Sequence, residues 1–347
     1  MPERPATTDQ SGTSPTGGPG GASGGAPLTA ALDIGGTKIA AALVTAGGEV
    51  VARARRPTPA TPHAAEVQAA VTACLRELAG HPGWRRVTAL GVCSAGPVDR
   101  ARGTASPVNI PAWRDHPLLR NLGEVPGLPE LAGLRTVFAG DAVAMTAAEH
   151  RYGAARGHAD ALCMVVSTGV GAGLVLDGRV RPGPTGNAGH LGHVSVDLAG
   201  EPCPCGSRGC LERLASGGAI TRHALALGWR PAPGAESGTA SVAAAAREGD
   251  TAALAAFDRA ARALAAGIAG CSTLLELEVA VLGGGVMHAS DLLLPAVKQH
   301  LDEYAALPFA RIQIKAAALG TDAGLIGAAA LAQTAGTAGT AETPETV

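Results

Sequence analysis

The sequence predicts an α/β protein built from two lobes. From about residue 28 to residue 333, short apolar segments typical of strands alternate with segments whose apolar residues recur at helical spacing. Each half of this pattern begins with two strand-like segments around a glycine-rich turn, at 28–32 with 39–44 and at 161–166 with 173–176. Alternating strands and helices are typical of α/β folds, and the repeated opening indicates two lobes.

The smaller first lobe is predicted to span residues 28–150. After its opening hairpin, a helix is expected over 63–79, where Val67, Val71, Leu75 and Leu78 share one face. Strands are expected at 87–92 and 136–138. A helical stretch to about residue 152 should follow the second of these strands.

The larger second lobe is predicted to span residues 151–319. Alanine-rich helices are expected at about 241–248 and 251–275, followed by a strand at 278–282 that ends in three glycines. A last helix, over about 322–333, should begin after Thr321 as N-cap, and the segment 320–333 should complete the first lobe. The tails, 1–27 and 334–347, lack periodicity and are predicted to be disordered.

Three cysteines within eight positions, Cys203, Cys205 and Cys210, form the most informative local pattern, and His193 lies ten residues before the first of them. One imidazole and three thiolates make a closed tetrahedral zinc site, which is a structural type of site. The two glycines between Cys205 and Cys210 suit a tight knuckle whose sulfurs face inward. Glu212, two positions after the last cysteine, would then be held beside the metal.

Two other interpretations of these cysteines were weighed. A disulfide would leave one of the three unpaired, and the N-terminal residues carry no apolar signal segment that would indicate an oxidising compartment. Ordinary buried cysteines would not need the flanking glycines. We therefore predict zinc, and we expect the remaining cysteines to be small core residues: Cys74, Cys93, Cys163 and Cys271.

Composition excludes several classes of protein. Hydrophobic residues make up 46% of the 347 residues, which allows a sizeable core, and aromatic residues make up only 2%. A net charge of −2 indicates no nucleic-acid partner. No apolar run approaches the ~20 residues of a membrane span, so we expect no membrane association and a soluble, cytoplasmic protein.

Three glycine turns at strand ends could bring backbone N–H groups to phosphate oxygens. Each alone is as compatible with a simple tight turn. The first follows Asp33, the second contains Thr168, and the third is the triple glycine at 283–285. The spacing of the first is not that of a Walker loop, and that of the third is not a complete Rossmann fingerprint. Their combination favours a nucleotide held between two lobes.

The order of these motifs resembles the ROK family of sugar kinases and related repressors, within the actin-like ATPase superfamily. Asp33-Ile34-Gly35-Gly36-Thr37-Lys38 looks like the first phosphate motif of that family, and the segment 167–173 looks like the second. The segment 281–286 is similar to its adenosine motif, and 186–193 with the cysteine knuckle is similar to its signature. The resemblance runs from about residue 28 to 332. It implies an actin-like, ribonuclease H-like fold and an ATP-dependent, glucokinase-like hexose kinase that uses Mg²⁺ with ATP.

The resemblance also implies roles for individual residues. It makes Asp141 the catalytic base that contacts the sugar, and Asp33 the residue that orients Mg²⁺ and its waters. The implied nucleotide- and phosphate-binding residues are Asp33, Gly35, Gly36, Thr37, Lys38, Thr168, Gly169, Gly171, Gly283, Gly284 and Gly285. The implied sugar-binding residues are Gly96, Asn109, Asp141, His190, His193 and Glu212. A structural reading remains beside each: Asp141 could only cap its helix, Asp33 could be a turn residue, and His190 could belong to a satisfied core network.

Two positions depart from the family pattern, and both lie on the sugar side. Gly140 stands where the family usually has asparagine, and His190 stands where it usually has glutamate. An active kinase with an altered sugar preference is the simplest interpretation, and lost activity is the alternative. Glucose, mannose, fructose, N-acetylglucosamine and N-acetylmannosamine are all compatible with the sequence, and polyphosphate is an alternative donor.

The competing function is a sugar-responsive regulator of the same family, or a non-catalytic sugar sensor. Regulators carry a winged-helix domain of about sixty residues or more before the first phosphate motif, whereas 27 glycine-rich residues precede Leu28 in this sequence. We therefore expect no DNA binding. We also expect a homodimer or a higher homo-oligomer.

Overall fold

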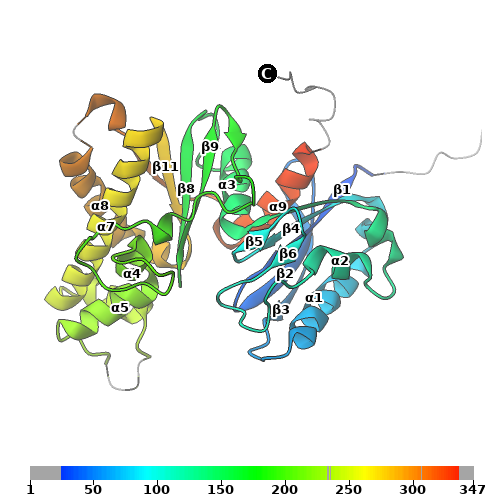
Figure 1. Ribbon diagram of the computed structural model, residues 1–347, viewed down its shortest axis with the longest axis horizontal. Helices are drawn as coiled ribbons and strands as arrows, with labels where there is room; N and C mark the ends of the chain where they lie inside the picture. The colour runs from blue at the N-terminus through cyan, green and yellow to red at the C-terminus, as the bar shows by residue number, and fades with distance from the viewer. Residues whose placement is uncertain (1–24, 233, 235, 306, 336–347) are drawn as a thin grey trace, which may run out of the picture.

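Two five-stranded sheets organise the chain, as seen in the computed structural model (Figure 1). The structure describes residues 25–335 apart from residues 233, 235 and 306. Most of each predicted disordered tail, 1–27 and 334–347, therefore lies outside the described residues. Each sheet has its own hydrophobic core, and the two cores are built mainly from aliphatic side chains.

The first sheet has the strand order β3-β2-β1-β4-β7. Its strands are β1 Leu28–Ile34, β2 Lys38–Val44, β3 Val50–Pro57, β4 Val87–Ser94 and β7 Arg135–Gly140. The predicted hairpin forms because β1 and β2 pair antiparallel, whereas β1, β4 and β7 are parallel. The parallel strands therefore present their carboxyl ends at one edge, which is where ligands bind in open α/β sheets.

Helix α1, Ala64–Ala79, covers β2 and β3 with the face that the sequence predicted. Its buried residues are Val67, Val71, Cys74, Leu75 and Leu78. Between β4 and β7 the chain forms the short pair β5 Val98–Asp99 and β6 Thr104–Ala105, and then α2 Leu118–Gly123. This excursion carries the loop around Asn109.

The second sheet repeats the arrangement of the first, with the strand order β10-β9-β8-β11-β12. Its strands are β8 Ala161–Val166, β9 Val170–Leu176, β10 Arg179–Val180, β11 Val279–Gly283 and β12 Gln313–Ala316. Again a hairpin, β8 with β9, adjoins parallel strands, β8 with β11 and β12. The two glycine-rich hairpin turns thus occupy equivalent places in the two lobes.

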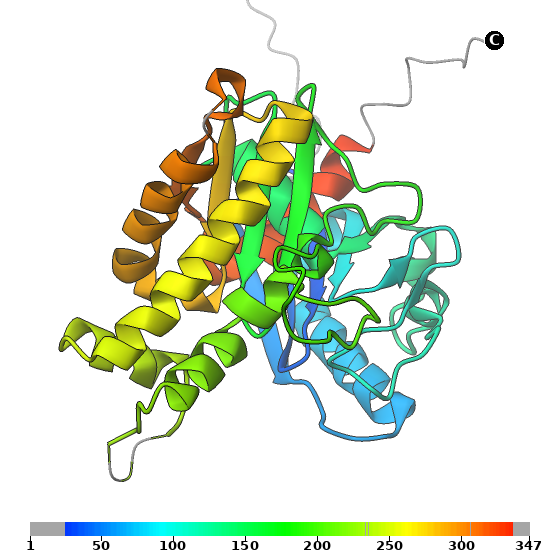
Figure 2. The ribbon, with the colours of Figure 1, turned by 60° about the vertical axis from the view of Figure 1, so that its left-hand side comes forward.

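The remaining helices of the second lobe cover one side of its sheet. They are α4 Leu211–Ala215, α5 Gly217–Ala226, α6 Thr239–Arg247, α7 Thr251–Leu275 and α8 Ser290–Tyr304. Figure 2 shows the long helix α7 running beside α8 across this side of the molecule. Among the described residues, no helix combines the length and apolar character that crossing a membrane requires.

Helices α3, Asp141–Tyr152, and α9, Ala323–Thr334, lie together between the two sheets (Figure 1). Helix α3 also packs on β8 and β9, and α9 also packs on β1 and β4. Their backbones approach closely because position 327 is glycine: a Cβ atom there would overlap the backbone of Ala144. The pair α3–α9 therefore connects the lobes, and α3 begins where the first sheet ends.

The predicted cap of the last helix is wrong. Helix α9 begins at Ala323, with Asp322 in the N-cap position, and Thr321 lies in the preceding 3₁₀ turn Gly320–Asp322. The Asp322 side chain caps nothing either, because its Oδ2 atom accepts a hydrogen bond from Arg53 at 2.6 Å. The side chain at the observed N-cap position thus contacts the first sheet and leaves α9 without a side-chain cap.

Candidate active site and metal centre

Two carboxylates and a thiol gather at the carboxyl edge of the first sheet. Asp33 lies near the end of β1, paired in register with Cys93 of β4, and Asp141 is the residue that directly follows β7. The Cys93 thiol donates to Asp33 Oδ1 at 3.5 Å and lies 3.5 Å from the carbonyl oxygen of Gly324, in the first turn of α9. Parallel strands thus bring together residues that are more than a hundred positions apart in the sequence.

The environment of these groups shifts their proton affinities. Burial raises the pKa of Asp141 to about 6, the nearby Asp33 carboxylate adds to the rise, and the N–H of Ala142 opposes it. Burial likewise raises the pKa of Asp33, while the Lys38 ammonium lowers it. Asp141 retains exposed surface although protein surrounds its carboxyl group. A carboxylate with a pKa near 6 suits a general base at neutral pH.

The sequence also allows a helix-capping role for Asp141, and the structure shows one contact of this kind. Asp141 is the first residue of α3, and its Oδ1 atom accepts from the N–H of Ala142 at 2.7 Å. One carboxylate oxygen is thereby held by the helix end. The contact orients the carboxyl group and does not compete with a catalytic role.

The first glycine turn, between β1 and β2, is closed by backbone contacts. The N–H of Gly35 donates to the carbonyl oxygen of Lys38 at 2.9 Å. Position 36 faces the loop after β6: a Cβ atom there would lie 2.5 Å from Asn109 Cγ. The structure thus places Asn109, a residue that the family resemblance implies for the sugar, against the first glycine turn. Thr37 is exposed at the tip of this turn.

The second and third glycine turns lie against each other. The N–H of Ser167 donates to Gly169 across the β8–β9 turn at 2.8 Å, and Thr168 is exposed at its tip. Gly284 has a φ of 94°, and a Cβ atom there would lie 2.5 Å from the carbonyl oxygen of Val166. Only glycine fits both the left-handed backbone and this close approach. The turn that follows β11 therefore stacks on the turn that follows β8.

A contact at the start of α3 links the two lobes at the site. A Cβ atom at Gly171, the second residue of β9, would lie 3.3 Å from the Cβ atom of Ala142. Ala142 follows Asp141, so the acidic edge of the first sheet lies beside the start of β9, next to the second glycine turn.

The signature segment 186–193 lies against the first lobe. Asn187 exchanges two hydrogen bonds with the backbone of Val98, at 3.0 Å and 2.7 Å. A Cβ atom at Gly96 would lie 3.5 Å from His190 Nε2, and the ring centroids of His190 and His193 are 6.2 Å apart. The structure therefore brings together Gly96 and both histidines, with His190 exposed to solvent.

Gly140 stands at the same junction. A Cβ atom there would lie 3.7 Å from the carbonyl oxygen of Gly186, which is an ordinary van der Waals distance. The position therefore has room for a Cβ atom, so close backbone approach does not by itself require glycine there.

Glu212 lies at the second glycine turn, between β8 and β9. Its Oε2 atom accepts from the N–H of Val170 at 2.9 Å, and a Cβ atom at Gly169 would lie 2.6 Å from the same oxygen. Glu212 is the second residue of α4, directly after the knuckle. The structure thus ties the knuckle to the β8–β9 turn through one carboxylate.

Backbone contacts fold the knuckle, residues 203–210, into a closed loop. The N–H of Cys203 donates to Ser207 at 2.8 Å, and the N–H of Gly206 donates to Cys203 at 3.0 Å. Gly209 has a φ of 58°, and a Cβ atom there would overlap the carbonyl group of Asp197. The glycines that the sequence analysis singled out are therefore required by the backbone.

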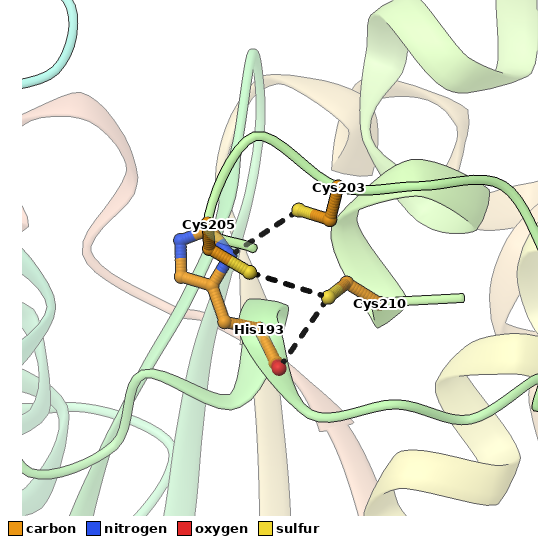
Figure 3. A group of neighbouring side chains, drawn as sticks. All are labelled: His193, Cys203, Cys205 and Cys210. Atoms are coloured by element: carbon orange, nitrogen blue, oxygen red, sulfur yellow. Dashed lines mark hydrogen bonds between the residues drawn. The ribbon is translucent and has the colours of Figure 1, made fainter. Parts of the chain in front are cut away.

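The four predicted metal ligands converge (Figure 3). The ligand atoms of His193, Cys203, Cys205 and Cys210 all lie within 4.8 Å of one another. Cys205 Sγ is 3.6 Å from Cys210 Sγ, and Cys203 Sγ is 3.8 Å from His193 Nδ1. Tetrahedral Zn–S bonds of about 2.3 Å place two sulfurs about 3.8 Å apart. The residues fit a closed zinc site, and the nitrogen of His193 that lies toward Cys203 is Nδ1.

Comparison with known proteins identifies the family. The model of the ROK family matches residues 29–335. The chain belongs to the ROK family. A glucokinase of Streptomyces coelicolor is 34% identical to this ROK protein over 324 residues, covering 88% of this chain and 98% of the relative. An N-acetylmannosamine kinase of Escherichia coli O157:H7 is 36% identical over 306 residues, with the same coverage of 88% and 98%.

A solved structure extends this similarity to the fold. The crystal structure of a ROK family glucokinase from Streptomyces griseus in complex with glucose and AMPPNP has a TM-score of 0.74 and 34% identity to this ROK protein. The alignment covers 88% of this chain and 99% of that chain. The predicted actin-like α/β fold and the family resemblance are thereby confirmed.

Sequence reasoning missed three residues at the site of this ROK protein. Cys93 is buried in the core, as predicted, and its thiol also contacts Asp33, which the sequence did not indicate. Gly324 packs closely against the same carboxylate, since a Cβ atom at this position would lie 2.6 Å from Asp33 Oδ2. Asn187 lies in the signature segment without a predicted role, yet its side chain joins the lobes. Strand register and helix packing create these contacts, and no local pattern in the sequence marks them.

Proposed function

We propose that this ROK protein is an ATP-dependent hexose kinase that transfers the γ-phosphoryl group to a hexose hydroxyl, with the C6 hydroxyl as acceptor. The observation that carries the proposal is the position of Asp141. Its carboxyl group lies at the carboxyl edge of the first sheet and has a pKa raised to about 6. Asp141 is also the first residue of α3, the helix that contacts β9 beside the second glycine turn. Relatives that are glucokinases and an N-acetylmannosamine kinase support a sugar as substrate.

In the proposed reaction Asp141 accepts the proton of the attacking hydroxyl. Phosphoryl transfer depends mainly on positioning and electrostatic stabilisation, so the protein must hold the hydroxyl in line and remove its proton. The contact with Ala142 N–H holds one oxygen of the carboxylate and leaves the other for the hydroxyl. Since its pKa is about 6, Asp141 is ionised at neutral pH.

The three glycine turns would hold the nucleotide through backbone N–H groups. Turns without side chains let phosphate oxygens approach the backbone closely. In this proposal the turns after β1 and β8 take the phosphates, and the triple glycine after β11 takes the adenosine. Mg²⁺ bound with ATP would neutralise developing charge on the phosphates, and Asp33 is the carboxylate placed to orient it.

The sugar-binding residues are proposed to be those that converge from both lobes. One group consists of Gly96, His190 and His193, which lie together. Asn109 lies against the first glycine turn, and Glu212 lies against the second glycine turn. Nε2 of His193 remains available for a sugar hydroxyl because Nδ1 faces the cysteines. A buried hydroxyl needs a partner, and these side chains supply donors and acceptors.

We further propose that the His193–Cys203–Cys205–Cys210 set binds one structural Zn²⁺. Four protein ligands leave no position for water, so the ion would hold residues in place and not activate a nucleophile. The Zn²⁺ ion would position its ligand His193 and the neighbouring Glu212. The second nitrogen of a metal-bound imidazole commonly makes the functional hydrogen bond.

A coupled kinase assay on the zinc-containing full chain tests the proposal. The panel is glucose, mannose, fructose, N-acetylglucosamine and N-acetylmannosamine, each with ATP·Mg²⁺ and separately with polyphosphate. We expect ATP-dependent phosphorylation of at least one sugar. Sugar binding in calorimetry without turnover on any member of the panel would refute a kinase and support a non-catalytic sensor.

A further inference from the structure

A small cavity lies outside the candidate site, between α4, α5, α7 and the segment that enters the knuckle. Its volume is ≈ 230 Å³. It is lined by Glu201, Arg213, Ala219, Arg222, His223, Ala226 and Arg259. These helices pack on one another, and Figure 1 shows α4 and α5 beside the lower end of α7. None of the lining residues has a role in the proposed kinase reaction.

The cavity has an excess of positive charge. Three guanidinium groups line it, against the single carboxylate of Glu201. Arg213 pairs with Glu201, with an Nη2–Oε2 distance of 2.8 Å. Within the part of the chain that the structure describes, Arg222 and Arg259 form no ion pair or hydrogen bond. Two guanidinium groups at one small cavity therefore lack a counter-charge.

His223 lines the same cavity and adds a hydrogen-bonding group. Burial lowers the pKa of His223, the Arg259 charge lowers it further, and Glu201 opposes the shift. The imidazole is therefore neutral at physiological pH and offers one donor and one acceptor nitrogen. The imidazole therefore offers directed hydrogen bonds to a ligand in the cavity and adds no charge.

Arg213 has a donor that the protein leaves unsatisfied. Its Nη2 group reaches Glu201, whereas its Nε atom is buried and has no hydrogen-bond partner among the described residues. Buried donors are nearly always paired in folded proteins because an unpaired one is costly. The guanidinium group of Arg213 therefore has hydrogen-bonding capacity that the described residues do not use.

We propose that this cavity binds a small phosphate-bearing anion, either inorganic phosphate or a phosphate monoester. The planar guanidinium fork matches phosphate oxygens, and a dianion balances the two guanidinium groups that lack a counter-charge. The volume is below the about 300–1,000 Å³ of pockets for drug-sized ligands. A phosphate with a few attached atoms fits the cavity better than a nucleotide does.

The cavity borders the kinase site without overlapping it. Arg213 follows Glu212 in α4, and the carbonyl oxygen of Glu201 accepts from the N–H of Gly209 in the knuckle at 2.8 Å. An anion seated on Arg213 would therefore brace α4 against α5 and α7. We expect its binding to raise the thermal midpoint of the protein, since a ligand that binds only the folded state stabilises it.

Isothermal titration calorimetry with inorganic phosphate and with glycerol 3-phosphate tests the site. Titrations are run at constant ionic strength with sodium chloride as the reference salt, and with AMPPNP present at saturation so that the nucleotide turns are occupied. We expect one equivalent of phosphate or phosphate ester to bind. The double variant Arg222→Gln, Arg259→Gln should weaken binding by about tenfold or more.

Arg262→Gln is the matched control, because Arg262 is exposed on the same helix as Arg259 and does not line the cavity. It should bind the probes like the unmodified protein. If the double variant has a lower thermal midpoint in chloride, the single variant at the exposed Arg222 replaces it and should still weaken binding. Equal binding by the variants and the unmodified protein, or no phosphate binding above the chloride reference, would overturn the proposal. Tighter binding of glycerol 3-phosphate would identify an ester as the ligand type, and tighter binding of inorganic phosphate would identify the free ion.

Discussion

Replacing Asp141 with asparagine separates the catalytic role of this residue from its structural one. The amide keeps the size of the carboxyl group and can still accept from the N–H of Ala142, but it cannot take the proton of a sugar hydroxyl. Loss of a general base typically costs a factor of about 10²–10⁴ in turnover. We expect a fall in kcat of that order, with sugar and ATP binding retained.

The same substitution should stabilise the protein at neutral pH. The pKa of Asp141 is raised from 3.8 to about 6 in the folded protein. Ionisation therefore destabilises the folded state: the free energy of unfolding falls as pH rises from about 4 to about 6, and the penalty is complete above 6. A shift of this size, discounted for the exposed surface of the residue, corresponds to about 1 kcal/mol. The asparagine variant avoids this penalty and should melt about 2 °C higher at pH 7.5.

Steady-state kinetics, calorimetry and thermal melting of the two proteins measure these quantities. In the unmodified enzyme, kcat/KM should fall about tenfold per pH unit below pH 6, because the base must be ionised in the free enzyme. Asp302→Asn, at an exposed position of α8, is the control and should change none of them. Near-normal turnover in the Asp141 variant would reduce Asp141 to a helix-end residue and refute the reasoning.

Three further predictions concern the metal, the sugar and the acidic edge. Purified protein should contain about one zinc per chain, and Cys205→Ser should lower both the zinc content, measured by elemental analysis, and the affinity for sugar. The combined change Gly140→Asn and His190→Glu should raise the ratio of kcat/KM for glucose to that for N-acetylhexosamines, and an unchanged ratio would mean that these positions do not read the sugar. Gly324→Ala places a Cβ atom 2.6 Å from Asp33 Oδ2, so the substitution should displace that carboxylate. We expect it to raise the Mg²⁺ concentration needed for half-maximal rate. An unchanged Mg²⁺ dependence would show that the contact between Gly324 and Asp33 is unimportant.

The elements with strong local signals were predicted well. Helices α1 and α7 have long apolar faces, and the hairpins β1–β2 and β8–β9 have apolar strands around glycine turns, so their patterns are visible in single segments. Strand β12, with the sequence QIKA and one buried residue, and helix α8, which contains Pro295, carry weaker local signals and were not predicted. These elements form because neighbouring strands and helices stabilise them.

The residues of the candidate site also divide into those that the sequence predicted and those that only the structure revealed. The sequence alone was enough to predict the four residues of the candidate metal site, because His193 and the three cysteines lie within eighteen positions and a short loop can bring them together without help from the rest of the fold. The glycine turns were also visible in the sequence, and at Gly284 a positive φ and a close backbone approach require this residue type.

Only the tertiary structure decided which distant residues surround Asp33. Cys93 reaches it through the parallel register of β1 and β4, and Gly324 reaches it because α9 returns from the C-terminus to pack beside the first sheet. The cavity between α4, α5 and α7 likewise depends on how three helices pack. Local patterns specify turns and amphipathic faces, whereas contacts between distant segments depend on strand register and helix packing, which are determined by the energy of the whole fold.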